Sequence, residues 1–433
     1  MTWLIYFLPL PVLYFLRNRP LLKNLFEGLC ENPRENILLG LLMFSLFFLG
    51  GERSEGVGLV DRARMLRILL MGAIVVLFWA PVLLGRPLRS PPLTVTLMAI
   101  FSVVAGLTAL YSPSPMFTLW KAFEIFAHVT VAWAFVTRIN EVESFLRVPA
   151  MLWLVFIYVG ITLLLGVLFF PSQAFFSPIA DNSGVVLSMT MRGIAPSVHP
   201  NSAGQVGAFL ALIGIVLVLI EGGKFRIDGM AVFGAGGVIM VLAHARTSLI
   251  AFVFVIGLFF VAGNRSFRRP IVFLAVSVVV CAGLLSIGII EDYLMRGQSH
   301  AQFVSMTGRV YTWERAWAAF IERPLEGYGF YVGVKHAIQY HTTDSTCFNI
   351  LLGGGFLLLV PIGAAVLIAG TQATILLMKR ETSADGMIAI GLFIMVAIRS
   401  VTASTIDSNH FNLIVFLLAT LVLSSANKVR IKW

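Results

Sequence analysis

Residues 147–170 read RVPAMLWLVFIYVGITLLLGVLFF and contain no charged side chain after Arg147. A helix rises about 1.5 Å per residue, so this stretch is long enough to cross the roughly 30 Å hydrocarbon core of a bilayer. Similar apolar stretches recur along the chain of 433 residues, of which 58% are hydrophobic and 12% are charged. Soluble domains carry about 25% charged residues. The composition therefore excludes a soluble globular enzyme, a disordered chain and a disulfide scaffold.

Charges, prolines and glycines bound the apolar stretches and define candidate membrane spans. We expect about 12 or 13 transmembrane helices, the first two being the shortest. The first segment lacks a basic start and a small-residue cleavage site, which favours a retained helix over a signal peptide. The sequence predicts an all-α polytopic membrane protein with one integral membrane domain, residues 1–433. The candidate spans are 2–16, 37–51, 67–85, 92–111, 117–137, 147–170, 203–220, 229–243, 248–263, 271–290, 348–377, 385–401 and 409–425.

The net charge of +10 is concentrated in short loops, which the positive-inside rule assigns to the cytoplasm. These loops carry Lys224 and Arg226; Arg265, Arg268 and Arg269; Lys379 and Arg380; and Lys428, Arg430 and Lys432. The two long loops, 171–202 and 291–347, then face outward. The 52–66 loop conflicts with this pattern, because it carries Arg53, Arg62 and Arg64 although strict alternation places it outside; its three acidic residues count for little under this rule. Either a short N-terminal segment does not span, or the rule fails locally.

The 291–347 loop contains an amphipathic pattern near 308–323, which predicts a helix at the membrane surface or over a cavity. Pro324 ends it, and the two glycines that follow permit a tight turn. The apolar side chains at helical spacing are Val310, Trp313, Trp317, Phe320 and Ile321.

Outward polar residues are the candidates for chemistry, because polar groups at membrane depth are costly and usually face a cavity or a partner. Arg192 is the only basic residue of the 171–202 loop, and we favour a functional role for it. His199 and Asn201 lead into a helix start, where Asn201 is also a plausible N-cap. For this pair, a structural role and a ligand role carry equal weight.

Arg246 lies in a very short outward turn, where it either reaches the lipid headgroups or binds a diphosphate or carboxylate. Arg309 opens the amphipathic helix, and a helix N-terminus with a guanidinium suits an anion. His341 and Asp344 precede the next span and are candidates for a general base. The alternatives are a solvated histidine and a helix N-cap.

Two further sets of polar residues have structural alternatives. Lys121, Glu124 and His128 share one helix face, where an internal Lys121–Glu124 pair is favoured over a proton relay. Arg399 and Asp407 flank the last outward turn, where they either pair or line the site.

Other signatures are missing from the sequence. The cysteines Cys30, Cys281 and Cys347 are far apart and form no CxxC, so neither a zinc site nor a disulfide framework is indicated. There is no Walker A, GxSxG or HExxH motif, and no acidic pair of the kind that binds a metal–nucleotide complex. No metal, cofactor or nucleic acid is expected.

Four segments in order resemble the bacterial O-antigen ligase and polysaccharide polymerase superfamily. They are MRGIAPSVHPNSAGQ from Met191, HARTSLIA from His244, TGRVYTWERAWAAFIERPLEGYGF from Thr307, and TDSTCFNILLGGGFLLLVPIGA from Thr343. Each motif is short, but their order, spacing and shared outward side make the combination specific. The resemblance runs from residue 192 to residue 360.

The resemblance implies a multi-pass glycosyltransferase of the bacterial inner membrane with a periplasmic active site. Such enzymes take a glycan from undecaprenyl diphosphate and need neither metal nor cofactor. By position, Arg192 and Arg246 would bind the diphosphate and Arg309 would lie over the site. The family's base is usually a histidine followed by asparagine; here that position reads Asp344-Ser345, with His341 three residues earlier. The base is therefore either His341 or Asp344.

The expected function is a repeat-unit polymerase of extracellular polysaccharide or O-antigen, with an O-antigen ligase as the alternative. The polymerase is preferred to the ligase because the His-Asn pair is absent. Expected partners are undecaprenyl-diphosphate-linked oligosaccharide, the lipid bilayer, and chain-length regulator and export proteins. A transporter or flippase is the rival of another class, and an export-complex scaffold is a third. Loss of function on replacing Arg192 or Arg246 with alanine would separate the enzyme from the scaffold.

Overall fold

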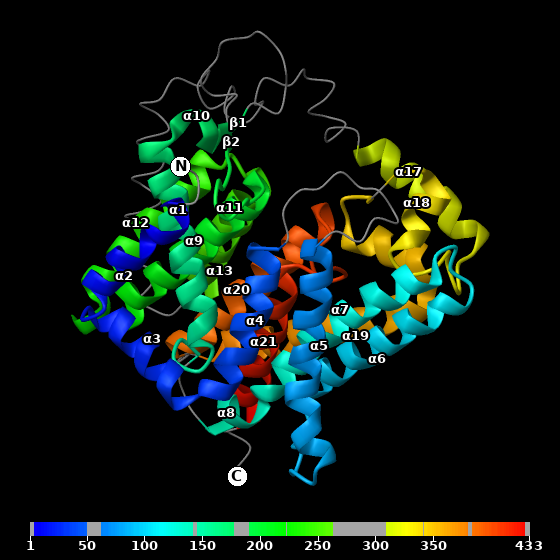
Figure 1. Ribbon diagram of the computed structural model, residues 1–433, viewed down its shortest axis with the longest axis horizontal. Coiled ribbons are helices and arrows are strands. Elements are labelled where there is room, and N and C mark those ends of the chain that lie inside the picture. The colour runs from blue at the N-terminus through cyan, green and yellow to red at the C-terminus, as the bar shows by residue number, and fades with distance from the viewer. Residues whose placement is uncertain are drawn as a thin grey trace.

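The protein is described by a computed structural model (Figure 1). It describes residues 4–49, 62–141, 145–176, 190–221, 223–262, 309–340, 342–379 and 383–428. The architecture is the predicted all-α one. Phe175–Phe176 (β1) and Thr190–Met191 (β2) add one short antiparallel pair.

The N-terminal helices are short and are separated by prolines. They are α1 (Leu4–Phe7), α2 (Pro9–Leu16), α3 (Pro20–Glu31) and α4 (Pro33–Phe47). The sequence left 17–36 as a loop, but α3 buries Leu21, Leu22, Leu25 and Gly28 against the bundle. At 15 residues, α4 extends roughly 22 Å, which is shorter than the hydrocarbon core.

Longer helices form the body of the molecule. Its first half contains α5 (Arg62–Leu83), α6 (Leu93–Leu107), η1 (Thr108–Leu110), α7 (Pro115–Ala134), α8 (Val136–Glu141), α9 (Ala150–Phe169) and α10 (Pro171–Ala174). Its second half contains α11 (Pro200–Val216), η3 (Leu217–Glu221), η4 (Gly223–Phe225), α12 (Arg226–Leu242), α13 (Arg246–Ala262), α17 (Arg309–Glu322), α18 (Val332–Ile338), α19 (Thr346–Met378), α20 (Ala384–Thr402) and α21 (Phe411–Lys428).

Seven helices in the described ranges are long and apolar enough to cross a membrane. These helices are Arg62–Leu83, Leu93–Leu110, Ala150–Phe169, Pro200–Ile220, Gly223–Leu242, Thr346–Met378 and Ala384–Thr402. Two shorter apolar helices, Arg246–Ala262 and Phe411–Ala426, lie beside them. The expected span 271–290 is outside the described residues. The central helices α11, α20 and α21 are largely buried by their neighbours, whereas α5 presents many apolar side chains outward.

The bundle has two chemically different ends. Helices α5, α7, α11, α13, α19 and α21 begin at one end, which we call the cavity end. We call the other end the basic end. There, Arg19 Nε donates to Asp228 Oδ1 at 2.8 Å, and this hydrogen bond joins the start of α3 to the start of α12. Because Arg67 in the first turns of α5 lies at the cavity end, that helix starts there, as strict alternation requires.

The segment 309–340 is anchored onto the cavity end (Figure 1). Ala316 and Phe320 of α17 are buried beside α18 and α19. The exposed side chains of this helix include Trp317 and Ile321. The buried face is therefore rotated from the apolar face that the sequence spacing predicts, because the partners of α17 are α18 and α19.

Helix α19 is interrupted near its first third, where the sequence predicts one continuous span. Gly354 and Gly355 have non-helical dihedral angles, and the φ of Gly355 is +57°. The backbone N–H groups of Phe356 and Leu357 donate to the carbonyl oxygens of Pro324 and Leu325 at 2.9 and 3.2 Å. The turn after α17 is thereby inserted into the break, which fixes the 309–340 segment relative to the cavity.

Candidate functional site

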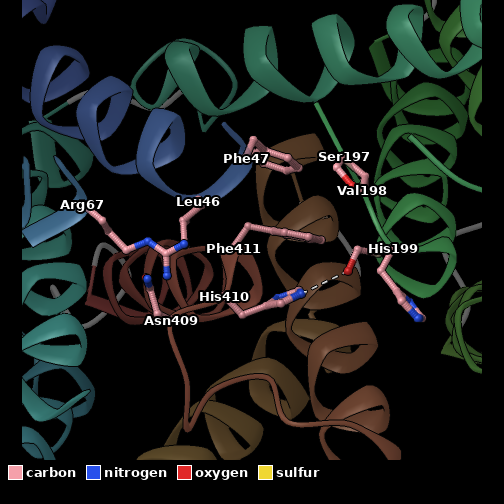
Figure 2. Close-up of a pocket in the computed structure, with 10 residues that line it drawn as sticks. Leu46, Phe47, Arg67, Ser197, Val198, His199, Asn409, His410 and Phe411 are labelled. Carbon is pink, nitrogen blue, oxygen red and sulfur yellow. Dashed lines mark hydrogen bonds between the residues drawn. The ribbon is translucent and has the colours of Figure 1, made fainter. Parts of the chain in front are cut away.

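A polar cavity of 390 Å³ lies at the cavity end. It is bounded by the starts of α5, α7, α11 and α19, by the end of α20, and by the 403–410 turn between α20 and α21. The lining residues are Arg67, Lys121, His199, Asn201, Ser202, Phe330, Tyr331, Val334, Thr342, Asp344, Asn349, Arg399, Ala403, Ser404, Asp407, Ser408, Asn409 and His410. A smaller hollow of 160 Å³ shares Arg67, His199, Ser202, Asn409 and His410 with it (Figure 2).

Asp407 holds the 403–410 turn in place. Its carboxylate accepts hydrogen bonds from Thr346 Oγ1 at 2.7 Å and from Asn349 Nδ2 at 3.0 Å, both on α19. Ser404 Oγ and the Thr405 N–H, within the turn, donate at 3.1 and 3.0 Å. Burial raises the pKa of Asp407, and the hydrogen bonds from Thr346 and Asn349 oppose that effect. Asp407 therefore lines the cavity, which is one of the two alternatives that the sequence left open. Its hydrogen bonds also fix the cavity wall.

Arg399 places a buried positive charge at the cavity wall. Its guanidinium, on the last turn of α20, is 5% exposed. Nη1 donates to the backbone carbonyl of Asn201, to Gln205 Oε1 at 3.3 Å and to Ser248 Oγ at 3.2 Å. All three acceptors are neutral, and Arg399 forms no ion pair among the described residues. A buried cation with neutral partners favours an anionic ligand.

Glu124 organises a second group of charges. Its fully buried carboxylate lies 2.9 Å from Lys121 Nζ and 3.7 Å from Arg67 Nη1, and it accepts from Asn409 Nδ2 at 3.1 Å. The internal Lys121–Glu124 pair predicted from the sequence is confirmed. Two cations share one carboxylate, so this group retains one excess positive charge beside the cavity.

Arg309 and Asp344 meet at the border of the cavity. Arg309 Nε lies 3.3 Å from Asp344 Oδ2, and the Asp344 side chain is half exposed. Arg309 also lines a small space together with Asn201, Thr247, Ser248 and Arg399. Asp344 does not cap α19, because Ser345 occupies the N-cap position. Its backbone has φ +53°, and its N–H donates to Thr342 Oγ1 at 3.1 Å.

His199 is the N-cap of α11, and the prediction that Asn201 fills that position is wrong. His199 Nδ1 accepts the N–H of Asn201 at 3.1 Å, and Pro200 takes the first helical position. Because proline has no N–H, the N–H of Asn201 is the first in the helix that needs a capping acceptor. Both residues still line the cavity; the carbonyl of Asn201 is the acceptor for Arg399.

His410 points its ring toward the start of α11, where the dashed line marks its hydrogen bond with Ser202 (Figure 2). Its Nδ1 accepts the N–H of Asn412 at 3.1 Å, which leaves Nε2 to donate to Ser202 Oγ at 3.3 Å. Burial, followed by the charge of Arg399, lowers the pKa of His410 to about 3. The imidazole is therefore neutral near pH 7 and acts as a hydrogen-bonding group.

Two predicted residues, Arg192 and Arg246, are not among the residues that line the cavity. Arg192 is exposed, and its Nε donates to the carbonyl of Gln173 at 3.2 Å. Arg246 is half buried and lies between Ala245 and Thr247, two residues of the Arg309–Arg399 space. His341 lies outside the described residues. The structure thus brings together Arg309, Asp344, His199 and Asn201 around one end of the bundle.

Sequence reasoning missed Arg67, Asn349, Asn409 and His410. Arg67 opens the expected span 67–85, close to Arg62 and Arg64, and hydropathy does not show toward which neighbour its side chain turns. The signal for Asn409 and His410 was the unusual density of Ser, Thr, Asp, Asn and His in the short segment before the final helix, STIDSNH.

The fold and the cavity define a polytopic membrane protein with a cation-rich site at one end. The family model described as O-antigen ligase matches residues 229–363, which include Arg246, Arg309, Asp344 and Asn349. The matched segment is just under a third of the chain. Over this segment the chain is similar to the O-antigen ligase and polymerase superfamily, whose members are glycosyltransferase-like enzymes. No curated protein matches the chain.

Proposed function

We propose that this protein transfers a glycan from undecaprenyl diphosphate to a growing lipid-linked repeat-unit chain. The observation that carries the proposal is the arrangement around one cavity, where the Arg309–Asp344 pair borders the same space as the buried Arg399. A proton acceptor next to uncompensated cations suits a reaction that deprotonates a hydroxyl and releases a polyanion.

The reaction assigns a separate task to each type of residue. The acceptor hydroxyl gives its proton to Asp344 or His341, and its oxygen attacks the anomeric carbon of the donor glycan. The bond between that carbon and the phosphate oxygen breaks, and the electron pair leaves with the diphosphate. Arg309 and Arg399 stabilise the developing negative charge, because fixed cations in a site shielded from water interact strongly with it.

Arg246 and Arg192 remain part of the proposal as ligands outside the cavity lining. Arg246 is adjacent to residues that line the Arg309–Arg399 space, so the outer phosphate of the donor is its proposed partner. Arg192 lies earlier in the chain, in the loop before α11, where the mouth of the site is proposed to be.

Arginine substitutions test this assignment. Reconstituted full-length protein would be assayed with a lipid-linked repeat unit, comparing Arg309→Ala and Arg399→Gln with Arg315→Ala, an exposed arginine on the same helix α17. Loss of one charge-stabilising group costs about 100-fold or more in rate. We expect such a loss in the first two variants and near-normal activity in the third. Equal activity in all three would overturn the assignment.

The product separates polymerase from ligase. Longer lipid-linked glycans identify a polymerase, whereas transfer to lipid A-core alone identifies an O-antigen ligase. The polymerase is preferred because the His-Asn pair that is usual in the family is absent here, and Asp344-Ser345 stands in its place. If a folded, monodisperse preparation forms neither product, the proposed function is wrong.

A further inference from the structure

A second pocket lies at the basic end, away from the polar cavity. Helix α5 contributes Arg67 to the cavity and, more than ten residues later, Phe78 and Val82 to this pocket. The basic-end pocket has a volume of 250 Å³. It is lined by Arg34, Glu35, Phe78, Val82, Arg86, Pro87, Leu88, Arg89, Trp133, Ala134, Val136 and Arg138.

Arg34 is built into the wall of this pocket. Its Nη2 donates to the carbonyl oxygens of Leu77 at 3.2 Å and Phe78 at 3.3 Å. Pro81 lies four residues after Leu77 inside α5 and has no N–H, so the Leu77 carbonyl lacks its helical donor. Arg34 supplies the missing donor, which fixes one guanidinium at the base of the pocket.

Positive charge exceeds negative charge in this pocket. Four arginines line it, and Glu35 is the one carboxylate among the lining residues. Glu35 is buried, and its Oε1 lies 3.7 Å from Arg138 Nε. Arg86 and Arg89 lie on the exposed linker between α5 and α6. Several guanidinium groups around one small space match the oxygen atoms of a phosphate.

The surroundings of the pocket are apolar and aromatic. Leu83 and Leu84 beside it are 84% and 87% exposed. Trp133 stacks edge-on with Trp79 at a centroid distance of 5.4 Å and donates from Nε1 to the Arg89 carbonyl at 3.0 Å. Tryptophan with basic side chains is typical of the membrane–water interface. A ligand here meets cations at one end and exposed leucines at the other.

We propose that the basic-end pocket binds the phosphate group of an anionic phospholipid, whose acyl chains lie along Leu83 and Leu84. A phosphate ester attached to hydrocarbon chains satisfies both parts of the surface, whereas a soluble phosphate uses only the arginines. This proposal does not rest on the proposed glycosyltransferase function, because the pocket shares no lining residue with the polar cavity.

Lipid binding to the full-length protein tests the proposal. Phosphatidylglycerol would be titrated against a phosphatidylcholine background, and bound lipid would be counted by native mass spectrometry. Arg86→Ala with Arg89→Ala should weaken phosphatidylglycerol binding roughly 30-fold, and lysine at both positions should largely preserve it. The matched control is Lys224→Ala with Arg226→Ala, which removes two exposed cations at the start of α12, also at the basic end, and should have little effect.

Three outcomes would overturn the proposal. Equal losses in the alanine variant and the control would mean diffuse attraction to a charged surface. Full displacement of the lipid by an equal concentration of inorganic phosphate would identify a site for a soluble anion. Unchanged phosphatidylglycerol binding in an alanine variant that unfolds at the wild-type temperature would remove Arg86 and Arg89 from the site.

Discussion

We propose Asp344 as a residue that receives a proton at the cavity border. It is half exposed, faces the cavity, and lies 3.3 Å from Arg309. We expect Asp344→Asn to lower the turnover rate about 100-fold or more, because the amide keeps the shape and removes the base. Steady-state assays on lipid-linked substrate would measure this. Glu314→Gln, an exposed carboxylate on α17, is the control and should be neutral.

His341 provides the competing result at the same step. If His341→Gln is inactive while Asp344→Asn retains most of its rate, His341 is the base and Asp344 positions Arg309. If both variants work normally, neither residue is the base. The activities of these variants distinguish the two residues, because the sequence alone leaves both as candidates for the base.

His410 makes stability depend on pH. Its pKa is lowered to about 3 by burial and by the charges of Arg399, His128 and His199, whereas an unfolded histidine titrates near 6.5. Between these values the unfolded chain binds more protons, so stability rises with pH and is fully present above about 6.5. We expect the unfolding temperature of purified protein to fall from pH 7 to pH 5, and to fall less in His410→Gln. A steeper fall in the variant would contradict this.

Single residues of the site were only partly predictable. Arg309, Asp344, His199 and Asn201 were recognisable as outward polar residues before or after apolar spans. Arg67 was not, because helical phase decides whether an arginine near a basic loop turns toward solvent or toward Glu124. That phase depends on packing of α5 against α4 and α7, which the local sequence does not specify.

At the scale of elements, the break in α19 determines where the 309–340 segment docks. A Cβ on Gly355 would lie 2.4 Å from the Pro324 carbonyl oxygen, and its φ of +57° disfavours any side chain. We expect Gly355→Ala to destabilise the protein by about 1–2 kcal/mol or more and to lower activity by displacing Asp344. Thermal unfolding and transfer assays would measure both effects.

Gly363→Ala is the matched control on the same helix. Nothing lies within 4 Å of the added Cβ at this position. Alanine is the better helix former by about 1 kcal/mol, so this variant should be as stable as the wild type or slightly more so. A Gly355→Ala protein as stable as Gly363→Ala would show that the break does not hold the segment.

Elements were predictable where hydropathy alone decides them. Helices α9 and α20 follow the expected spans within a few residues, because long uncharged stretches have few alternatives in a membrane. Helix α3 was missed because its mixed composition matches a surface loop, and tertiary contacts through Leu21 and Leu25 stabilise it. The α19 break was missed because hydropathy does not detect a backbone dihedral angle.

At the scale of the whole molecule, the two ends predict opposite sides of the membrane. Lys224→Cys marks the basic end and Lys335→Cys the cavity end, each in a background without other cysteines; both positions are exposed. We expect an impermeant maleimide added to spheroplasts to label position 335, and position 224 only after permeabilisation. Labelling of both positions from the same side would contradict the topology.

The convergence of distant segments was beyond prediction from the sequence. Arg67, Lys121, Arg399 and His410 come from four helices or turns separated by long intervals, yet they line one space. Hydropathy gives the order and direction of spans, whereas neighbour relations depend on packing. Close contacts such as Gly214 of α11 against Phe233 of α12, which a Cβ would meet at 2.4 Å, set those relations.

The cavity volume of 390 Å³ limits how much of each substrate the proposed enzyme can recognise. Pockets of roughly 300–1,000 Å³ enclose one small organic molecule. Under the proposed function, a space of this size holds only the two reacting ends, and all other sugars of either glycan extend outside it. The rate of each transfer should therefore be the same for a glycan of a few sugars and for one of several dozen.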